Sequence, residues 1–510
     1  MSSNVSSSGP GQLTSEYWLS RRDHLFMASC IALIVTAMSF AIRGALIQPL
    51  AEQFNLTKEQ LGWIISTAFW GFTLSQIIGG PLCDVLGMGR LLVLAFIGHL
   101  IGIFLTVFAT GFWTLFFSTL AFGLGNGFVE AACNPLVPTL YPDQKIKRLN
   151  LFHTWFPGGI VIGGLVAYGI SHIAPKGIAG INSWQLQMLS MLIPLAIYAA
   201  MFVGRKFPAS ERTAAGVSTG AMYKECTQPL FLLFVFCMLM TAVTELGPNQ
   251  WIGNIVGNLT GIKGDAILYL VWITGLMAVG RSFAGPIIHS MPSPVMVLMG
   301  SAFFSGIGLF MISQAHSATT AAIAATIFAV GVCFFWPTML GVVSEKFPKS
   351  GALGLAIMGG AGMLASSFGQ PIIGAKYDKV SAEYVQANAA TWEPSVEKWI
   401  GLNIQVKDPK KQHDWKMELA EAKSNPAKSV SLLANVVTVA SSEDVKDNVQ
   451  QSQLAKPAID VKTASDSAGG AAALKQLVFL PAILFVLFTG IYLYDKSKGG
   501  YQKELLHQNQ

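Results

Sequence analysis

Residues 123–150 read GLGNGFVEAACNPLVPTLYPDQKIKRLN, and they place a carboxylate, Glu130, inside an apolar run long enough to cross a bilayer. A charge at the centre of a membrane costs at least ~2.5–3.5 kcal/mol on insertion scales, so such a residue usually faces water, finds a partner or holds a proton. Asn126 and Asn134 stand one helical turn on either side, near the same helix face. Two prolines follow and free backbone carbonyls. The stretch therefore predicts a membrane helix that lines a polar site.

The composition indicates a polytopic membrane protein. Of the 510 residues, 52% are hydrophobic and only 12% are charged, whereas a soluble domain is about 25% charged. The net charge of +6 is small and spread among loops, which indicates orientation in the lipid bilayer and not nucleic-acid binding. The six cysteines include no CxxC pair. We therefore expect no disulfide framework, no metal site and no cofactor.

Hydropathy predicts an all-α fold with twelve membrane helices. They lie near residues 24–47, 59–83, 90–110, 112–140, 149–172, 184–204, 230–256, 265–289, 295–313, 318–341, 352–376 and 474–495. The resulting division is a tail (1–23), a first six-helix bundle (24–204), a linker (205–229), helices seven to eleven (230–376), an insertion (377–473), helix twelve (474–495) and a second tail (496–510).

Lysine and arginine predict the orientation of these helices. They concentrate in both tails, the central linker and alternate short loops, which the positive-inside rule assigns to the cytoplasm. Both termini are then cytoplasmic, and the insertion 377–473 is extracytoplasmic. We expect an integral protein of the plasma membrane, or of the inner membrane in a Gram-negative cell, and a monomer.

An internal repeat predicts two related halves with pseudo-symmetry. Three short matches occur in the same order at offsets of 203, 205 and 206: residues 55–57 with 258–260, 80–82 with 285–287, and 141–142 with 347–348. A near-constant offset is typical of a duplicated six-plus-six transporter.

Residues 80–90, GPLCDVLGMGR, join the second and third helices. They resemble the G-x-L-a-D-r-x-G-r-k signature of the major facilitator superfamily, and the twelve-helix repeat fits the two bundles of that fold. In the family this motif lies at the cytoplasmic gate, so the resemblance implies a gating motif at Gly80, Asp84, Gly87 and Arg90. Physically, the glycines permit a tight turn and close helix approach, while Asp84 can cap a helix or pair with Arg90. A solvated turn is the alternative.

A narrower resemblance connects the chain to the fucose:proton symporter branch of that superfamily. It is carried by Glu130-Ala-Ala-Cys-Asn134-Pro135 and by residues 148–151, RLNL. The resemblance implies that Glu130 couples sugar transport to protons. This chain departs from the branch at Arg43, near which an aspartate is expected, and at His153 and Phe156 in the fifth helix.

Few charges fall inside the predicted helices: Arg43, Glu130, Glu245 and Arg281. The offset of 203 sends Arg43 to position 246, so we expect it to pair with Glu245 across the cavity between the bundles, as a state-dependent ion pair or substrate clamp. Glu130 and Glu245 are the predicted proton-coupling residues, with a purely structural glutamic acid as the alternative for Glu130. Arg281 is expected to snorkel at the inner end of helix eight, and His99 to be a packing residue.

A sugar-binding site needs amide groups that hydrogen-bond the sugar hydroxyls and an aromatic ring that packs against the C–H face of the sugar. Gly247-Pro248 is expected to break helix seven and expose backbone there. Interface anchoring and bridging between helices are the alternative roles for such residues. The predicted substrate-binding residues are Arg43, Gln76, Asn126, Asn134, Asn249, Gln250, Trp251 and Trp336, with Thr244 and Gln370 as further candidates.

The insertion 377–473 is polar and rich in Ala, Lys and Ser. Its first half carries three tryptophans and predicts a small helical lobe, whereas its second half, from Ser441, resembles a solvated linker. A lid or partner-docking element and a tolerated insertion are both compatible with this composition.

Together these features predict a secondary active transporter that takes up a sugar or related small polar solute with a proton by alternating access. We expect no enzyme, because the G-x-S-x-G pattern at 216–220 lies in the linker without a preceding strand. One alternative is an exporter or antiporter of an organic acid, with Arg43 as the carboxylate clamp. A second, of a different class, is a membrane sensor that does not transport and binds a partner through the insertion.

Overall fold

The computed structural model describes residues 20–54, 56, 58–210, 213, 216–260, 267–402, 413–442 and 449–504. These residues form helices joined by short turns, with one isolated β-bridge between Ile178 and Ile181. Within the described residues, eleven helices are long and apolar enough to cross a membrane, or twelve when one bent pair counts as a single span. The predicted all-helical membrane fold is confirmed.

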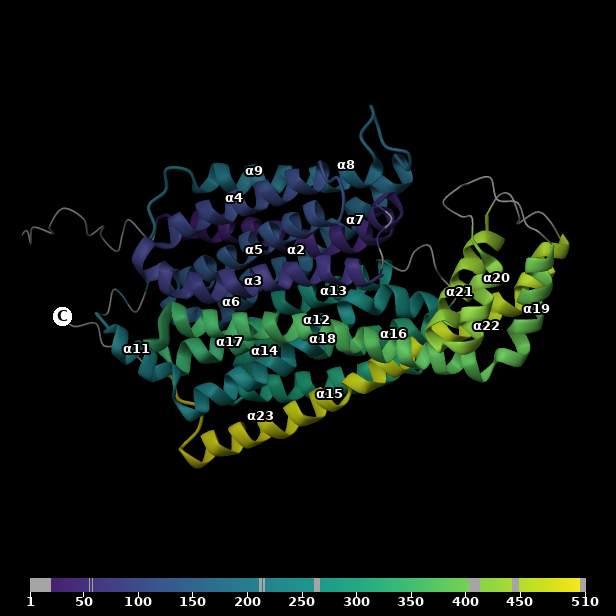
Figure 1. Ribbon diagram of the computed structural model, residues 1–510. Coiled ribbons are helices and arrows are strands. Elements are labelled where there is room, and N and C mark those ends of the chain that lie inside the picture. The colour runs from purple at the N-terminus through teal and green to yellow at the C-terminus, as the bar shows by residue number, and fades with distance from the viewer. Residues whose placement is uncertain are drawn as a thin grey trace, which may run out of the picture.

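The first half forms one layer of the molecule (Figure 1). Its first four spans are single helices, and its fifth and sixth spans are each divided. The elements are α2 (Arg22–Phe54), α3 (Lys58–Leu86), α4 (Met88–Val107), α5 (Phe112–Leu140), η1 (Pro142–Gln144), α6 (Lys145–His153), α7 (Trp155–Ile173), α8 (Ser183–Ser190) and α9 (Leu192–Phe202).

The second half forms the facing layer (Figure 1). Its eighth span is bent by 60° between α13 and α14, and its tenth is interrupted at residues 333–334. The elements are α11 (Thr219–Cys226), α12 (Pro229–Thr260), α13 (Ile267–Ser282), α14 (Ala284–Ser290), α15 (Pro294–Ser313), α16 (Ala318–Val332), α17 (Phe335–Lys346), η2 (Pro348–Ser350), α18 (Gly351–Ala387), α22 (Val449–Leu477) and α23 (Phe479–Ser497).

Glycine allows α3 and α5 to pack with their backbones in contact. A Cβ at Gly123 would meet the Ala68 carbonyl, and a Cβ at Gly127 would meet Ser75 and the Phe72 carbonyl. Small residues at helix contacts are the usual solution in a bilayer, where packing and not the hydrophobic effect drives association. This approach brings α3 and α5 close enough for their polar side chains to bond.

Small residues also join the two bundles where α3 crosses α18. Gly80 lies against Ala352 and Ala356, and Gly359 lies against Gln76. The bundles meet a second time where α6 packs on α14 and α17, with Lys147 beside Gly285 and Ile146 beside Gly341. Further contacts between the bundles are made by α7 with α13 and by α5 with α18.

The insertion forms a helical lobe at the opposite end (Figure 1). It contains α19 (Ala389–Gly401), α20 (Trp415–Ser424) and α21 (Pro426–Ala440). The helices α19 and α21 pack on the ends of α18 and α22, and α20 packs on α21. The lobe has its own apolar core, which includes the buried Trp392 and Trp399. The helical first half of the prediction is confirmed.

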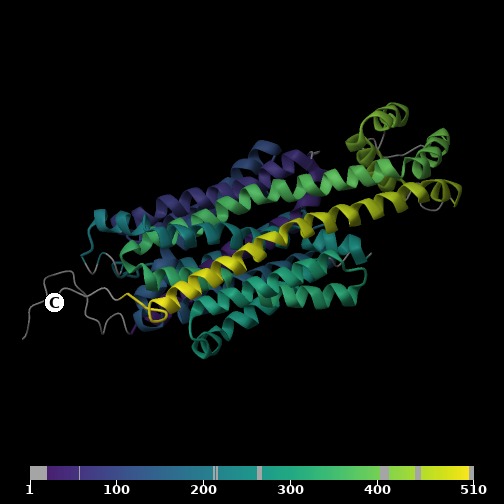
Figure 2. The same ribbon diagram turned by 90° about the horizontal axis from the view of Figure 1, so that it is seen from below.

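The prediction of a solvated linker from Ser441 onward is wrong, because residues 449–477 form the helix α22. Its small residues, among them Ala455, Ala458 and Gly469, form a buried stripe despite the polar composition. Lys456 and Lys462 form i,i+4 ion pairs on its other faces. Figure 2 shows α22 and α23 running in nearly one line along the bundle.

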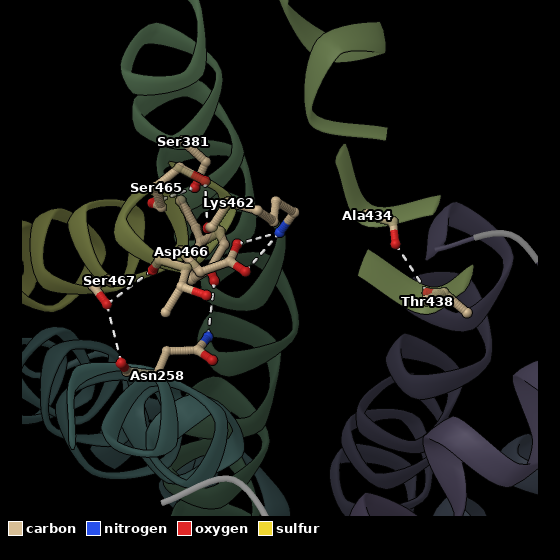
Figure 3. A network of polar contacts seen from close by, with 10 residues as sticks. Asn258, Ser381, Ala434, Thr438, Lys462, Ser465, Asp466 and Ser467 are labelled. Atoms are coloured by element: carbon tan, nitrogen blue, oxygen red, sulfur yellow. Dashed lines mark hydrogen bonds and ion pairs between the residues drawn. The ribbon is translucent and has the colours of Figure 1, made fainter. Parts of the chain in front are cut away.

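Polar contacts tie α22 to its neighbours where the lobe meets the bundle (Figure 3). Lys462 pairs with Asp466 at 2.6 Å. Ser381 Oγ of α18 donates to the Ser465 carbonyl at 3.0 Å, and Ser467 Oγ donates to the Asn258 carbonyl of α12 at 3.0 Å. The lobe is therefore attached to both α12 and α18 of the second bundle.

The expected break of helix seven at Gly247-Pro248 is wrong, since α12 continues through Pro248 to Thr260. Membrane helices tolerate an internal proline when neighbouring groups accommodate the freed carbonyl. Gly247 meanwhile packs beside Ile373 of α18, so the small residue serves helix packing.

The α3–α5 contact gives a test of the packing. Gly123→Ala places a methyl group against the Ala68 backbone, and overpacking of this kind costs ~1–3 kcal/mol. We expect a lower midpoint of thermal unfolding in detergent. The matched control, Gly62→Ala on α3, has nothing within 4 Å and should leave the midpoint unchanged or raise it. Equal midpoints for the two variants would contradict the packing argument.

Candidate functional site

Glu130 is the centre of a buried polar cluster on α5, and it is 1% exposed. Its Oε2 accepts hydrogen bonds from Asn134 Nδ2 at 3.1 Å and from Gln76 Nε2 of α3 at 3.3 Å. The Trp336 indole of α17 lies near the carboxyl group without a hydrogen bond of good geometry. Of the residues that the sequence singled out, Glu130, Asn134, Gln76 and Trp336 therefore lie together in the structure.

His153 extends this cluster to the end of α6. Asn134 donates its amide hydrogen to Glu130, so its Oδ1 is free to accept, and His153 Nε2 lies 3.0 Å from it. This arrangement assigns the proton of His153 to Nε2. The backbone carbonyl of the same residue accepts from Arg281 Nη1 at 2.9 Å.

Arg281 links this chain of contacts to the second buried carboxylate. Its Nη2 lies 3.0 Å from Glu245 Oε1, and the two side chains are 1% and 4% exposed. Its Nε donates to the Cys333 carbonyl at 2.6 Å. A continuous series of polar contacts therefore joins Glu130, through Asn134 and His153 in the first bundle, to Arg281 and Glu245 in the second.

Two predictions about the arginines are wrong. Arg281 is 2% exposed and does not snorkel, and Glu245 pairs with Arg281 and not with Arg43. Arg43 is tied to its own helix, because its Nε donates to the Ser39 carbonyl at 2.9 Å and its Nη2 to Ser39 Oγ at 3.2 Å. Its guanidinium also lies over the ring of Phe40.

Asn126 belongs to a separate network inside the first bundle. Its Nδ2 donates to Ser39 Oγ at 3.2 Å, and its Oδ1 lies 2.9 Å from His99 Nε2. His99 Nδ1 lies 3.2 Å from the Tyr198 hydroxyl. His99 is therefore a hydrogen-bonded residue of the bundle interior, and Asn126 faces away from the Glu130 cluster although it lies one turn from Glu130.

The remaining candidates lie along α12 and α18 toward the lobe. Trp251 Nε1 donates to Gln370 Oε1 at 2.7 Å, and Gln370 Nε2 donates to the Leu246 carbonyl at 3.2 Å. Thr244 Oγ1 donates to the Met240 carbonyl of its own helix at 2.8 Å. The side chain of Gln250 lies outside the described residues.

Besides Arg43 Nη1, four polar atoms on the candidate residues are buried without a hydrogen-bond partner. Three are acceptors: Gln76 Oε1, Glu245 Oε2 and Asn249 Oδ1. The fourth, Trp336 Nε1, is a donor. Unsatisfied buried polar groups are uncommon and costly in folded proteins, so these four atoms identify positions where a ligand or water would gain hydrogen bonds.

The predicted gating motif has the expected backbone. Gly87 adopts φ +83 between α3 and α4, a conformation that favours glycine, and Gly80 gives the close approach to α18 described above. Asp84 accepts hydrogen bonds from Ser210 Oγ at 2.6 Å and Thr213 Oγ1 at 3.1 Å, which fixes the central linker against α3. Arg90 is exposed. The gating role of these residues stays a prediction.

Comparison with known proteins identifies the family. The profile of the Major Facilitator Superfamily matches residues 28–373, more than half of the chain. The chain belongs to the Major Facilitator Superfamily. The resemblance to this superfamily that was found in residues 80–90 is therefore confirmed.

Individual members of the superfamily differ in what they carry. The D-xylose transporter of Levilactobacillus brevis is 30% identical over 131 residues, which cover 26% of this chain and 28% of that protein. The cis,cis-muconate transport protein of Acinetobacter baylyi is 23% identical over 277 residues, 51% of this chain and 64% of that protein. The chain thus matches less than two thirds of the length of either relative.

A solved superfamily structure supports the fold. The fucose:proton symporter of E. coli superposes with a TM-score of 0.54 at 18% identity, covering 69% of this chain and 91% of the symporter. At this identity the likeness concerns the fold, which is the two-bundle arrangement of the superfamily.

The ion pair gives a test of the site. Glu245→Ala would leave Arg281 buried without a counter-charge, a change that typically costs ~3–5 kcal/mol. We expect the double variant Glu245→Ala/Arg281→Ala to lose less stability in thermal unfolding than the sum of the two single losses. Glu245→Ala combined with Arg43→Ala should be additive within ~0.5 kcal/mol. Coupling of Glu245 to Arg43 and not to Arg281 would contradict the observed pairing.

Proposed function

We propose that this superfamily member takes up a sugar or related small polar solute together with a proton by alternating access. The observation that carries the proposal is the buried Glu130 carboxyl group, held by the Gln76 and Asn134 amides beside Trp336. Amides and an indole are the groups that bind hydroxyls and sugar C–H surface, and the cluster lies between α3, α5 and α17 of the two bundles.

The unpartnered atoms support a solute that carries hydroxyl groups. Three acceptors and one donor lack partners at Gln76, Glu245, Asn249 and Trp336. A hydroxyl both donates and accepts, so a polyol satisfies both kinds of atom. A carboxylate only accepts, so it would leave the three acceptor atoms without a donor.

The surroundings of Glu130 support a proton as the coupling ion. Glu245 has a direct guanidinium partner at 3.0 Å, whereas the contacts at Glu130 Oε2 come from the neutral amides of Gln76 and Asn134. An ionised carboxylate in a buried site without a contacting cation is costly, and a proton removes that cost. Glu130 would then be loaded with a proton before the site closes.

A second candidate function is transport of an organic acid, which one observation favours. Arg43 Nη1 is buried without a partner, and Arg43 lines a pocket within the first bundle, with mainly apolar neighbours that include Phe40, Leu46 and Phe69. An arginine of this kind would bind a carboxylate. The similarity to a muconate transport protein is compatible with that function.

The placement in the cell follows from the positive-inside pattern. We propose a plasma-membrane protein, acting as a monomer, with both termini in the cytoplasm and the lobe on the outer face. The sequence-based division of the chain and the proton-coupling role of Glu245 stay part of this proposal.

Glu130→Gln tests the coupling. The amide keeps the shape of the side chain but cannot ionise, so the variant should bind solute without carrying a proton. In proteoliposomes with an acidic exterior, we expect accumulation of labelled sugar to fall to its level without a gradient, while counterflow exchange is retained.

The matched control is Glu397→Gln, an exposed glutamate on the lobe, which should accumulate sugar normally. Undiminished accumulation by Glu130→Gln would remove Glu130 from the coupling role. A wild-type protein that moves neither sugars nor organic acids under either gradient would favour the sensor function.

Arg43→Ala separates the two candidate solutes. If the solute is a sugar, the variant should retain uptake within a few-fold, because Arg43 lies in the separate Ser39 network. If the solute is an organic acid, loss of a charge-assisted hydrogen bond costs about 1.5–3 kcal/mol, or roughly tenfold or more in uptake. A panel of labelled pentoses, hexoses and dicarboxylates, assayed with both proteins, distinguishes these outcomes.

A further inference from the structure

We propose that Arg281 is a reversible lock between the two bundles, because it binds two backbone carbonyls that prolines leave open, one in each bundle. This inference does not depend on which solute is carried. It assigns to Arg281 a positioning role in the conformational change.

Proline explains why the two carbonyls are available. In an α-helix the N–H of residue i donates to the carbonyl of residue i−4, and proline has no N–H. Pro157 therefore leaves the His153 carbonyl without its helical partner, and Pro337 does the same for the Cys333 carbonyl. The helices are interrupted at both places, at Thr154 between α6 and α7 and at residues 333–334 between α16 and α17.

One guanidinium takes up both open carbonyls. Arg281 Nε donates to the Cys333 carbonyl at 2.6 Å, and Nη1 donates to the His153 carbonyl at 2.9 Å. Its Nη2 holds Glu245 at 3.0 Å. The planar fork of arginine presents donors in several directions at once, so a lysine at this position would not reach all three acceptors.

Only one of these three bonds crosses between the bundles. Cys333 and Glu245 belong to the second bundle, as does Arg281, whereas His153 ends α6 in the first bundle. When α6 separates from α14 and α17, the bond from Arg281 to His153 must break while the other two remain. The same separation would uncover Ile146, which is 5% exposed and lies against Gly341.

The lock also contacts the Glu130 cluster through a single residue. The His153 side chain holds Asn134 at 3.0 Å, and its carbonyl holds Arg281 at 2.9 Å. The contact with Asn134 lies within the first bundle, so of these two contacts only the bond to Arg281 breaks when the bundles separate. The contact between α3 and α18 contains glycine and alanine packing instead, so it can separate without breaking a charge-assisted bond.

Alkylation of an introduced cysteine measures how often this interface opens. Ile146→Cys places a thiol at the buried contact, and a membrane-permeant maleimide reacts with it only in the open state. The six native cysteines are buried, and the protein without Ile146→Cys gives the background rate. In this reporter protein, Pro157→Ala restores an N–H that competes for the His153 carbonyl.

We expect Pro157→Ala and Arg281→Lys each to raise the alkylation rate by about tenfold, the equivalent of one lost hydrogen bond to a charged group. Pro371→Ala, an exposed proline within α18, is the matched control and should leave the rate unchanged. His153→Ala keeps the backbone carbonyl and should also leave it nearly unchanged.

An unchanged rate in both Pro157→Ala and Arg281→Lys would overturn the proposal, and so would an equal increase in Pro371→Ala. Unfolding is recognised separately, because it would expose the native cysteines of the variant as well. If Pro157→Ala fails to fold by size-exclusion chromatography, Arg281→Lys alone decides the outcome. None of these rates depends on solute uptake, so a wrong solute assignment does not affect the test.

Discussion

A charge in the interior of a membrane protein needs a partner, and this requirement shapes the centre of the molecule. The structure meets it in three ways. Arg281 and Glu245 neutralise each other at 3.0 Å. Glu130 is surrounded by neutral amides, and Arg43 relies on the backbone and hydroxyl of Ser39 and on an aromatic ring. The three groups therefore differ in what they can still bind: Glu245 is compensated, whereas Glu130 and Arg43 have no contacting counter-charge among the described residues.

Close helix packing makes these contacts available. The side chain of Gln76 reaches Glu130 because glycines on α5 let α3 approach at backbone distance, and Gln76 itself lies against Gly359 of α18. The same residue thus contacts both the proposed coupling carboxyl group and the facing bundle. A bulkier residue in place of a glycine on α5 would push α3 away and separate the Gln76 amide from the Glu130 carboxylate. The polar contact therefore depends on the close packing.

The sequence predicted the membrane fold and part of the site. Apolar runs and a repeat near 203 residues are sufficient for twelve spans, and the i,i+4 spacing of Glu130 and Asn134 correctly placed two partners together. The same spacing failed for Asn126, because a turn of helix fixes which face a residue shares but not which neighbour it meets. The offset that aligned Arg43 with position 246 predicts how deep a residue lies in the membrane, but it does not predict which way the side chain points around the helix axis. It therefore could not show that the Arg43 guanidinium would hydrogen-bond to Ser39.

Two further errors have local causes. Arg281 lies in the last turn of α13, but its bonds to Cys333, His153 and Glu245 hold the guanidinium in the interior, and no sequence pattern indicates these partners. The polar composition of α22 concealed a stripe of alanine and glycine that packs on the second bundle. The prolines four residues after His153 and Cys333 were the one sequence signal for backbone carbonyls that lack a helical hydrogen bond. This signal becomes informative only when the structure shows a donor, Arg281, beside those carbonyls.

The lobe rests on two long helices, α18 and α22, which both emerge from the second bundle (Figure 2). Both helices run without interruption from the bundle into the lobe, so the lobe is a continuous extension of that bundle. Any rocking of the second bundle about the membrane centre would sweep the lobe through an arc, and the displacement would grow with distance from the pivot. A small rotation of the second bundle would thus produce a large displacement of the lobe at the far end of the molecule.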